Sequence, residues 1–274
     1  MQTESRPSAS LLISTYNWPR ALELCLHSAL DQTYLPDEIL IADDGSTDET
    51  KTLINELKKI SKVPLHHFWH EDKGFRKTII LNEAIRHSRS EYIIQTDGDI
   101  LLHPRFIEEH LACAQKKYFL RGSRTLIKED ATLELLEKKK FQARWFDRGI
   151  AHRMNAWHSP PLSRFFSLFN DAHSIDGVKG CNFSFWKKDF IAVNGFNNDI
   201  LGWGREDSEL AIRLINSGIL KKHLKFRAVC FHLHHAIFSR DSDGRNMNML
   251  NAAIQNKLTT AENGFATLHP VVIL

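Results

Sequence analysis

Short apolar runs and amphipathic segments alternate along the first 120 residues. The runs lie at 11–13, 39–41, 65–69 and 92–94, and after each one apolar side chains recur at helical spacing. Four strand–helix units in succession predict right-handed crossovers and a mainly parallel sheet with helices on both faces. We therefore expect an α/β fold with a doubly wound sheet in this part of the chain.

Two residues mark helix starts in this region. Ser46 and Glu49 have the spacing of a capping box, and Pro104 is suited to the first turn of a helix. We expect the second helix to begin just after Ser46 and the fourth to begin at Pro104.

Polar residues follow each of the four predicted strands. In parallel α/β sheets, ligands bind beyond the carboxyl ends of the strands. One polar strand end is ordinary turn chemistry, whereas four on the same edge indicate a binding site. The four clusters are Thr15-Tyr16-Asn17, Asp43-Asp44-Gly45-Ser46, His70-Glu71-Asp72 and Asp97-Gly98-Asp99.

The periodic pattern loosens after residue 120. Residues 133–140 are typical of a basic amphipathic helix, and residues 141–169 interleave arginines with Trp and Phe. This mixture fits a core with solvated arginines, an acceptor-binding face, or a surface that contacts anionic lipid. Further on, the pattern predicts a strand at 183–186, a glycine-rich loop at 201–204, a helix over 210–215 and a strand at 228–231.

Composition and charge exclude several classes of protein. The 274 residues include 36 Lys and Arg against 33 Asp and Glu, and a net charge of +3 is too small to indicate a nucleic-acid partner. The four cysteines are far apart, which is typical of a reducing compartment. The chain shows no signal peptide and no run of ~18 apolar residues that would span a membrane. We expect a cytoplasmic protein.

Asp97-Gly98-Asp99 places two carboxylates at alternate positions after an apolar run. In an extended backbone both side chains would leave the same side of the chain and address one ligand. Carboxylate oxygens suit Mg²⁺ or Mn²⁺, which are often held by one or two carboxylates together with substrate phosphates. The alternative is a turn with Asp-Gly at its corner. Asp44 has the same two interpretations: turn chemistry, or a hydrogen bond to a nucleobase or ribose.

Asp207 precedes the predicted helix over 210–215. It fits either the N-cap of that helix or a general base that takes a proton from a hydroxyl group. Trp203 and two glycines beside adjacent acids favour the base, and the positive end of the helix would keep the carboxylate ionised.

Three histidines follow the last predicted strand. Strand alternation would place His232 and His234 on one face, where their imidazoles could bind a metal. The chain lacks H-E-x-x-H, G-x-G-x-x-G and G-x-x-x-x-G-K-[ST], which disfavours a metalloprotease, a dinucleotide-binding protein and a P-loop enzyme.

Taken together, the motifs resemble the family 2 glycosyltransferases, which have the GT-A fold. The later half is similar to the C-terminal portion of galactosyltransferase-type and chondroitin-polymerase-type enzymes. Arg205 stands where glycine is common in that family. The resemblance implies a single GT-A domain, with a nucleotide-sugar-binding half (1–120) and an acceptor-binding and catalytic half (121–274). The matching segments are 11–17, 42–48, 72–82, 97–99, 180–182 and 203–207.

The resemblance also implies roles for individual residues. Asp44 would bind the uracil of a UDP-sugar, and Asp97 would lie by the ribose and the donor sugar. Asp99 would ligate a divalent cation, Mn²⁺ or Mg²⁺, with His232 as first choice of histidine and His234 as second. Asp207 would be the base, and Glu206 would orient the acceptor. The other expected donor contacts are Thr15, Tyr16, Asn17, Arg76, Lys77, Gly98, Asn182, Trp203 and Gly204.

The implied activity is inverting transfer of a hexosyl unit from a UDP-sugar to a glycan or glycolipid acceptor. Bacterial surface polysaccharide and lipopolysaccharide are built this way at the inner face of the cell membrane, so we expect peripheral contact with anionic lipid through residues 141–169. Two other functions stay open. A sugar-nucleotide nucleotidyltransferase would need a glycine-rich, lysine-bearing N-terminal loop, which is not visible. A non-catalytic nucleotide or sugar-binding module is favoured if Asp99, Asp207 and His232 do not line one cleft.

Overall fold

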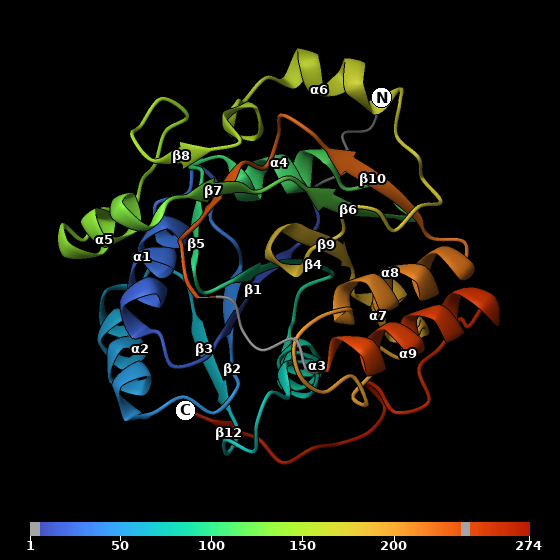
Figure 1. Cartoon of the computed structure of the whole chain (residues 1–274). Coiled ribbons are helices and arrows are strands. Elements are labelled where there is room, and N and C mark those ends of the chain that lie inside the picture. The colour runs from blue at the N-terminus through green and yellow to red at the C-terminus, as the bar shows by residue number, and fades with distance from the viewer. Residues whose placement is uncertain (1–5, 237–241) are drawn as a thin grey trace.

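The computed structural model describes residues 6–236 and 242–274, which form a large and a small β-sheet with helices packed around them (Figure 1). The strand order of the large sheet is β10-β6-β9-β4-β1-β2-β3-β12, and that of the small sheet is β5-β11-β7-β8. The large sheet contains β1 (Ala9–Thr15), β2 (Glu38–Asp43), β3 (Leu65–Trp69), β4 (Tyr92–Asp97), β6 (Tyr118–Gly122), β9 (Phe183–Trp186), β10 (Leu220–Leu224) and β12 (Val272–Ile273). The small sheet contains β5 (Ile100–Leu102), β7 (Thr125–Ile127), β8 (Ile150–Ala151) and β11 (Cys230–His232).

Helices cover both faces of the large sheet. The α-helices are α1 (Pro19–Leu30), α2 (Asp48–Ile60), α3 (Lys77–His87), α4 (Phe106–Cys113), α5 (Glu129–Glu137), α6 (Pro160–Ser167), α7 (Lys187–Ala192), α8 (Glu206–Asn216) and α9 (Asp243–Gln255). Short 3₁₀ turns are η1 (Arg153–Ala156) and η2 (Gly180–Asn182). Apolar residues of α1, α2 and α4 pack on one face of the sheet, and those of α3, α7 and α8 pack on the other.

The centre of the large sheet is parallel, as predicted. Strand β1 pairs in parallel with both β2 and β4, so that Thr15 lies opposite Asp43 and Ser14 lies opposite Asp97. The polar ends of the strands therefore meet at one edge. Antiparallel β9, between β4 and β6, makes the whole sheet mixed.

Helix α1 lies between the two sheets. Its residues Leu22, Cys25 and Leu26 join the core of the large sheet, whereas Ala21 and Leu24 join the core of the small sheet. Because side chains three and four positions apart share a helix face, α1 can serve both cores. This packing holds the small sheet, with Asp99 and His232 at its end, against the rim of the large one.

Several predicted element starts differ from the structure: the strand predicted at 228–231 is β11, which begins at Cys230, the helix predicted over 210–215 is α8, which begins at Glu206, and three further helices differ as follows. Helix α2 has Thr47 at its N-cap, and the Ser46 hydroxyl instead accepts a hydrogen bond from the backbone N–H of Asn17 at 2.9 Å. Helix α4 begins at Phe106 and not at Pro104. Pro104 lies before the helix, and its carbonyl accepts the backbone N–H of Thr33 at 2.8 Å. The predicted basic helix over 133–140 is α5, which begins four residues earlier with an acidic first turn.

No helix in the described part of the chain is both long and apolar enough to cross a lipid bilayer.

Candidate active site

Asp44 lies at the carboxyl end of β2 and is almost buried. Its Oδ1 contacts His70 Nε2 at 2.7 Å, and its Oδ2 accepts the backbone N–H of Arg76 at 2.9 Å. This network ties the second strand end to the third and to the start of α3. The structure thus brings the predicted nucleotide-contacting aspartate into a fixed position at the rim.

Asp97 lies at the carboxyl end of β4 and meets a lysine. Its Oδ1 accepts hydrogen bonds from Lys77 Nζ at 2.8 Å and from Ser14 Oγ at 2.7 Å. Lys77 Nζ is also 3.8 Å from Glu206 Oε1, so it links the starts of α3 and α8. Burial opposes the charge of Lys77, but Asp97, Glu206 and Asp207 raise its pKa above the ordinary value. Lys77 is therefore a fixed cation in the site.

Asp99 faces a different set of groups from Asp97. Residues 98–99 form a turn between β4 and β5, which differs from the extended backbone we expected. The two carboxylates therefore do not share one direct partner. Asp99 Oδ2 lies 3.5 Å from His232 Nε2 and 3.3 Å from His235 Nε2.

The cluster of Asp99, His232 and His235 has the composition of a metal site. One ligand atom from each residue lies within 4.8 Å of the others. Asp99 Oδ1 is buried and has no hydrogen-bond partner among the described residues. Burial lowers the pKa of His232, which favours the neutral imidazole that binds metals.

His234 is not part of this cluster. Strand β11 ends at His232, so the alternation we assumed does not continue to residue 234. The His234 side chain is exposed, and its backbone N–H donates to Thr132 Oγ1 at 2.9 Å. The structure places His235, which the sequence argument did not select, beside Asp99 instead.

Asp207 lies in the first turn of α8 rather than at its N-cap, which is Arg205. Its Oδ2 accepts the backbone N–H of Gly180 at 2.6 Å, while its Oδ1 is buried without a partner in the described chain. Burial and the neighbouring Glu206 raise the pKa of Asp207 to about 7, although Lys77 opposes the rise. The expectation that the helix start keeps Asp207 fully ionised is therefore wrong. A carboxyl group with this pKa can both accept and release a proton near neutral pH.

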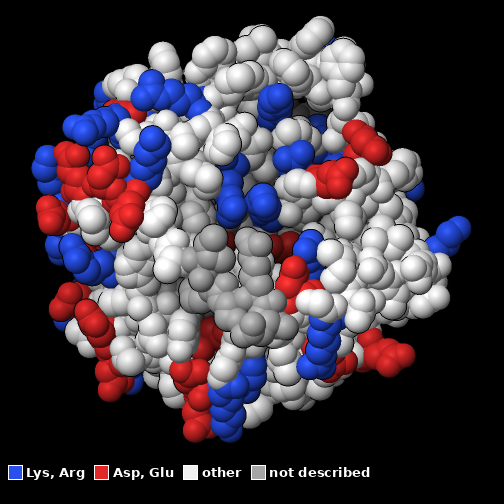
Figure 2. Space-filling model, in the orientation of Figure 1, with Lys and Arg blue, Asp and Glu red and all other residues white. Residues whose placement is uncertain are grey.

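The thiol of Cys181 is buried near the end of β4, where Thr96 Oγ1 donates to the Cys181 carbonyl at 3.1 Å. Burial raises the pKa of the thiol to about 12, and the charges of Asp97, Asp99 and Asp207 add to the rise. The contacts of Lys77 with Asp97 at 2.8 Å and with Glu206 at 3.8 Å bring the end of β4 to the start of α8, where Asp207 follows Glu206. Figure 2 shows acidic side chains set into a hollow at the centre of this face, with basic side chains along its upper edge.

The loop before α8 contains the Trp-Gly-Arg-Glu-Asp sequence. Arg205 has a φ of +78°, a left-handed conformation that favours glycine, and Gly204 has a φ of +104°. The Arg205 guanidinium donates to Asp243 Oδ1 at 2.8 Å, which holds it to α9. This ion pair explains how arginine stands where the resembling family commonly has glycine. Trp203 beside it is 38% exposed.

The other predicted donor contacts fall into two groups. Thr15, Asn17 and Gly98 lie at the rim: Asn17 Oδ1 accepts the backbone N–H of Thr47 at 2.9 Å, and Gly98 N–H donates to Ser14 O at 2.8 Å. The exposed Tyr16 donates its hydroxyl to Asp72 at 2.8 Å, and the Arg76 guanidinium turns away to the carbonyl of Glu71.

Asn182 lies inside the protein rather than at the rim. Its side chain is buried, and its Nδ2 donates to the carbonyls of Ser123 at 3.0 Å and Ala228 at 2.8 Å. His110 contacts its Oδ1 at 3.0 Å. These bonds occupy the amide, so Asn182 holds the segments that flank the site together and is not arranged to contact a donor.

One buried residue near Asp207 was missed. Gln95 on β4 is fully buried, and neither its Oε1 nor its Nε2 has a partner among the described residues. A methyl group on Gly180 would lie 2.6 Å from both Gln95 Nε2 and Asp207 Oδ1. A glutamine two positions before Asp97 points to the same sheet face, but no motif in the sequence singles it out.

The mixed sheet with helices on both faces is a GT-A-type fold. Residues 10–190 match the family described as glycosyl transferase family 2, and residues 160–236 match the N-terminal domain of galactosyltransferase. The chain therefore belongs to glycosyl transferase family 2, as the motifs predicted.

Relatives by sequence carry glycosyltransferase names. Validoxylamine A glucosyltransferase from Streptomyces hygroscopicus subsp. limoneus is 26% identical over 79% of this chain and 50% of its own length. Chondroitin synthase from Escherichia coli is 34% identical over 37% of this chain and 14% of its own length. This chain thus spans only about half of the Streptomyces enzyme.

Solved structures share the fold. A mannosyltransferase from Pyrobaculum calidifontis in complex with GDP-Man and Mn²⁺ is 17% identical, with a TM-score of 0.58 over 92% of this chain and 65% of that one. S. aureus TarS 1–349 in complex with UDP-GlcNAc is 14% identical, with a TM-score of 0.61 over 94% of this chain and 68% of that one. At these identities the likeness confirms the fold.

Proposed function

We propose that this protein is an inverting hexosyltransferase that moves a hexosyl unit from a UDP-sugar to a carbohydrate acceptor. The observation that carries the proposal is that Lys77 Nζ joins Asp97, 2.8 Å away, to Glu206, 3.8 Å away, so that the Glu206-Asp207 pair and the Asp97-Gly98-Asp99 segment meet at the carboxyl edge of the sheet. It joins a candidate base to a candidate cation site. A binding module would need no such base, and family 2 membership disfavours a nucleotidyltransferase.

Asp207 is the proposed general base. Its Oδ1 has no partner among the described residues, and the Gly180 N–H holds Oδ2, so one oxygen is fixed and the other is available. Oδ1 takes the proton of the acceptor hydroxyl as the hydroxyl oxygen bonds to the anomeric carbon. The bond from that carbon to the diphosphate oxygen breaks on the opposite face, and the nucleotide diphosphate leaves with the electron pair. The anomeric configuration is inverted.

Asp99, His232 and His235 would hold a divalent cation. The unpartnered Asp99 Oδ1 and the mixed oxygen and nitrogen donors fit Mn²⁺ or Mg²⁺. When bound, the ion would supply a Lewis acid that offsets the charge developing on the diphosphate. Lys77, held by Asp97, adds a positive charge that favours binding of the diphosphate. Its contacts with Asp97 and Glu206 also hold the donor side of the site next to the helix that carries the base.

The donor and acceptor are assigned to the two sides of the rim. Residues 1–120, with Asp44 at the nucleotide, form the proposed donor half, and residues 121–274 form the acceptor-binding and catalytic half, where Glu206 orients the acceptor. The relatives named above include a polysaccharide synthase. We propose that the acceptor is a glycan or glycolipid of bacterial surface polysaccharide or lipopolysaccharide.

Helix α6 is the proposed contact with the inner face of the cell membrane. Leu162, Phe165, Leu168 and Phe169, on and just after α6, are 39%, 56%, 77% and 72% exposed. Lys225 lies beside them, with its Nζ 4.4 Å from the ring centroid of Phe166. Apolar side chains next to a cation suit the headgroup region of an anionic bilayer. In Figure 2 the top of the molecule, over α6, carries few charged side chains.

A donor panel tests the proposed reaction. Purified protein is incubated with UDP- and GDP-hexoses, with and without Mn²⁺, and release of nucleotide diphosphate is measured. We expect release from a UDP-hexose, loss of release after chelation, and restoration by added Mn²⁺. The exposed Glu56→Gln variant is the control and should behave as wild type. Release only from GDP-sugars, or release that chelation does not change, contradicts the proposal.

Vesicle flotation tests the membrane contact independently. We expect the protein to float with vesicles that contain anionic lipid and not with neutral ones, and Phe165→Ser with Phe169→Ser to reduce the floated fraction at least fivefold. Equal flotation of the double variant removes this part of the proposal and leaves the reaction untouched.

A further inference from the structure

A second cavity lies one short strand away from the metal cluster. It has a volume of about 590 Å³, and residues from β11, the loop before β8, the segment after η1 and α6 line it. His103 lines it directly after β5, and Asp99 directly precedes β5. Four residues of extended chain span about 13 Å, so the cavity lies at a distance from Asp99 that an oligosaccharide, and not a single sugar, would span.

Aromatic rings that no core requires form one wall of this cavity. Trp145, Phe146 and Trp157 are 47%, 53% and 42% exposed. The ring centroids of Trp145 and Trp157 are 6.3 Å apart at 78° to each other. Exposed rings gathered in a hollow are typical of binding sites. The negative faces of such rings attract the C–H groups of a pyranose.

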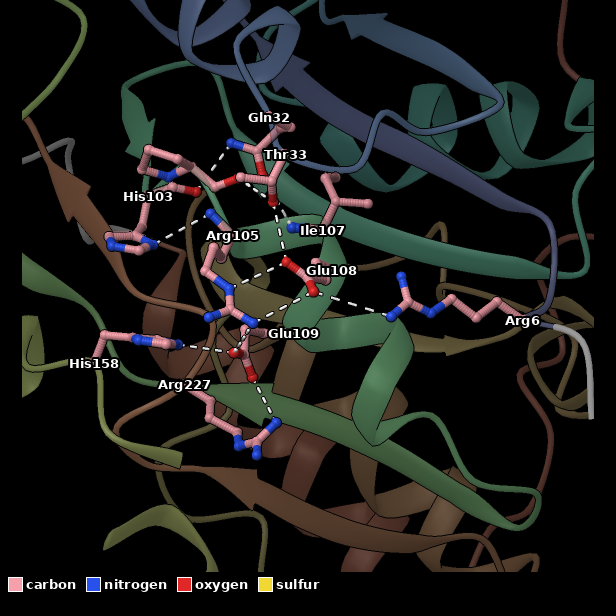
Figure 3. Close-up of polar contacts among 11 residues, drawn as sticks. Arg6, Gln32, Thr33, His103, Arg105, Ile107, Glu108, Glu109, His158 and Arg227 are labelled. Carbon is pink, nitrogen blue, oxygen red and sulfur yellow. Dashed lines mark hydrogen bonds and ion pairs between the residues drawn. The ribbon is translucent and has the colours of Figure 1, made fainter. Parts of the chain in front are cut away.

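Two histidines form a fixed polar edge. The rings of His103 and His158 are stacked with centroids 5.3 Å apart. The buried Glu109 contacts His158 Nε2 at 2.8 Å and also accepts a hydrogen bond from Arg227 at 2.6 Å, as Figure 3 shows. His103 Nδ1 accepts the backbone N–H of Arg105 at 3.2 Å, and burial lowers the pKa of His103 to about 4. His103 is therefore neutral with its proton on Nε2, which is a hydrogen-bond donor.

The cavity also carries the positive charge of Arg144, whose backbone N–H donates to the Asp147 carboxylate at 2.9 Å. Arg144 lines the cavity, and no described carboxylate forms an ion pair with its guanidinium, which lies 5.8 Å from the ring centroid of Phe146. No Asp or Glu is among the described residues that line the cavity. The lining therefore combines stacking surfaces, fixed hydrogen-bonding groups and one cation, and it favours an anionic ligand over a neutral one.

We propose that this cavity binds an acidic sugar residue of the acceptor, with its pyranose ring against Trp145 and Trp157 and its carboxylate or phosphate at Arg144. The inference rests on the proposed function and specifies the acceptor: an oligosaccharide that carries negative charge a few residues from the hydroxyl that is glycosylated. Phe165 and Phe169, on and just after α6, do not line the cavity, whereas Leu162 belongs both to its lining and to the proposed membrane contact.

Direct binding tests the proposal without a known acceptor. The probes are tetragalacturonate, which carries carboxylates, galactose 6-phosphate, which carries a phosphate, and neutral maltotetraose, each followed by tryptophan fluorescence and saturation-transfer NMR. We expect at least one acidic probe to bind at least fivefold more tightly than maltotetraose. Whichever acidic probe binds more tightly identifies the anionic group. Equal or absent binding of all three overturns the proposal.

Variants then locate the binding. Trp157→Ala and Trp145→Ala should each weaken binding of the acidic probe at least tenfold, and Arg144→Gln should remove the preference over maltotetraose. Phe169→Ala is the matched aromatic control and should leave the affinity for the soluble probes unchanged, because Phe169 does not line the cavity. UDP titration checks that every variant is folded. Unchanged probe binding in both tryptophan variants overturns the site, and loss of vesicle flotation in them instead assigns these rings to lipid.

The proposed function and this inference can fail separately. If a UDP-hexose is hydrolysed but no acidic probe binds, the cavity assignment fails and the reaction stands. If acidic probes bind as expected but no nucleotide sugar is used, the reaction fails, and with it the role of the cavity as an acceptor subsite.

Discussion

The rim of the large sheet and the segment 141–169 differ in how they hold polar and apolar groups. At the rim, carboxylates are buried and tied to fixed partners, as Asp97 is to Lys77 and Ser14. In the segment, Trp145, Phe146 and Phe169 are 47%, 53% and 72% exposed. Buried charge is costly unless it is paired, so the rim tolerates little change, whereas an exposed ring can be exchanged at small cost. The comparison predicts that rim substitutions affect the reaction and that substitutions in 141–169 affect what is bound.

The largest expected effects come from the metal cluster. Asp99→Ala should lower the transfer rate about a thousandfold or more, because it removes a ligand of the proposed cation, which would stabilise the charge developing on the diphosphate by several kcal/mol. His235→Ala should weaken activation by Mn²⁺ at least tenfold in a rate-against-Mn²⁺ titration. The neighbouring His234→Ala is the matched control and should stay within twofold of wild type. Equal losses in His234→Ala and His235→Ala would contradict the assignment of the cluster.

Gly180→Ala tests the space beside the base. The added methyl group would lie 2.6 Å from Asp207 Oδ1, so the carboxylate must move. A displacement near 1 Å can cost about a hundredfold in rate, and we expect a loss of that order in kcat with UDP binding kept. Gly244→Ala on α9 meets no atom within 4 Å and should not change kcat. A normal kcat in Gly180→Ala would show that the position of Asp207 is not critical.

The pH dependence follows from the raised pKa of Asp207. The base must be deprotonated, and with a pKa of about 7 we expect kcat/KM to fall about tenfold per pH unit below about pH 7. Glu206, Asp97 and Lys77 face this carboxyl group. A profile that stays flat down to pH 5 would contradict the assignment.

The same shift has an effect on stability. The folded pKa of Asp207 lies above its ordinary value, so its contribution to stability is full at low pH and is lost as the pH rises through about 7. Asp207→Asn should therefore unfold at a higher temperature than wild type at pH 8. The two proteins should converge near pH 4. Thermal unfolding at both pH values measures the difference.

The smallest expected effects are on the free energy of unfolding, and they compare a leucine in the core with a leucine on the surface. Leu210 on α8 is fully buried, whereas Leu168 is 77% exposed. Leu210→Ala should lower the free energy of unfolding by about 2–5 kcal/mol, and Leu168→Ala by no more than about 0.5 kcal/mol. Urea denaturation of the two variants gives both values. A large loss in Leu168→Ala would mean that the segment is part of a core and not a binding surface.

The sequence predicted the sheet well and the site in part. Strands at 65–69 and 183–186 have the predicted bounds. The position of the polar residues at one edge of the sheet could be predicted from the topology, since parallel strands bring their carboxyl ends together. Both of these results depend on local pattern and chain direction alone.

The wrong predictions concern residues whose position or pKa depends on tertiary contacts. Strand β11 ends at His232, so His235 and not His234 is the second histidine of the cluster. Asn182 lies in the 3₁₀ turn η2, and its side chain is buried. The pKa of Asp207 depends on burial and on Glu206 more than on the helix start. The sequence did not single out Gln95, because a single glutamine in a strand matches no motif.

Transfer by Asp207→Asn, measured together with UDP affinity, tests the central claim most directly. The substitution keeps the shape of the side chain and removes its ability to take a proton. We predict transfer at least about a hundredfold slower than wild type, with the Kd for UDP within twofold. Near-normal transfer with UDP binding retained would contradict the account.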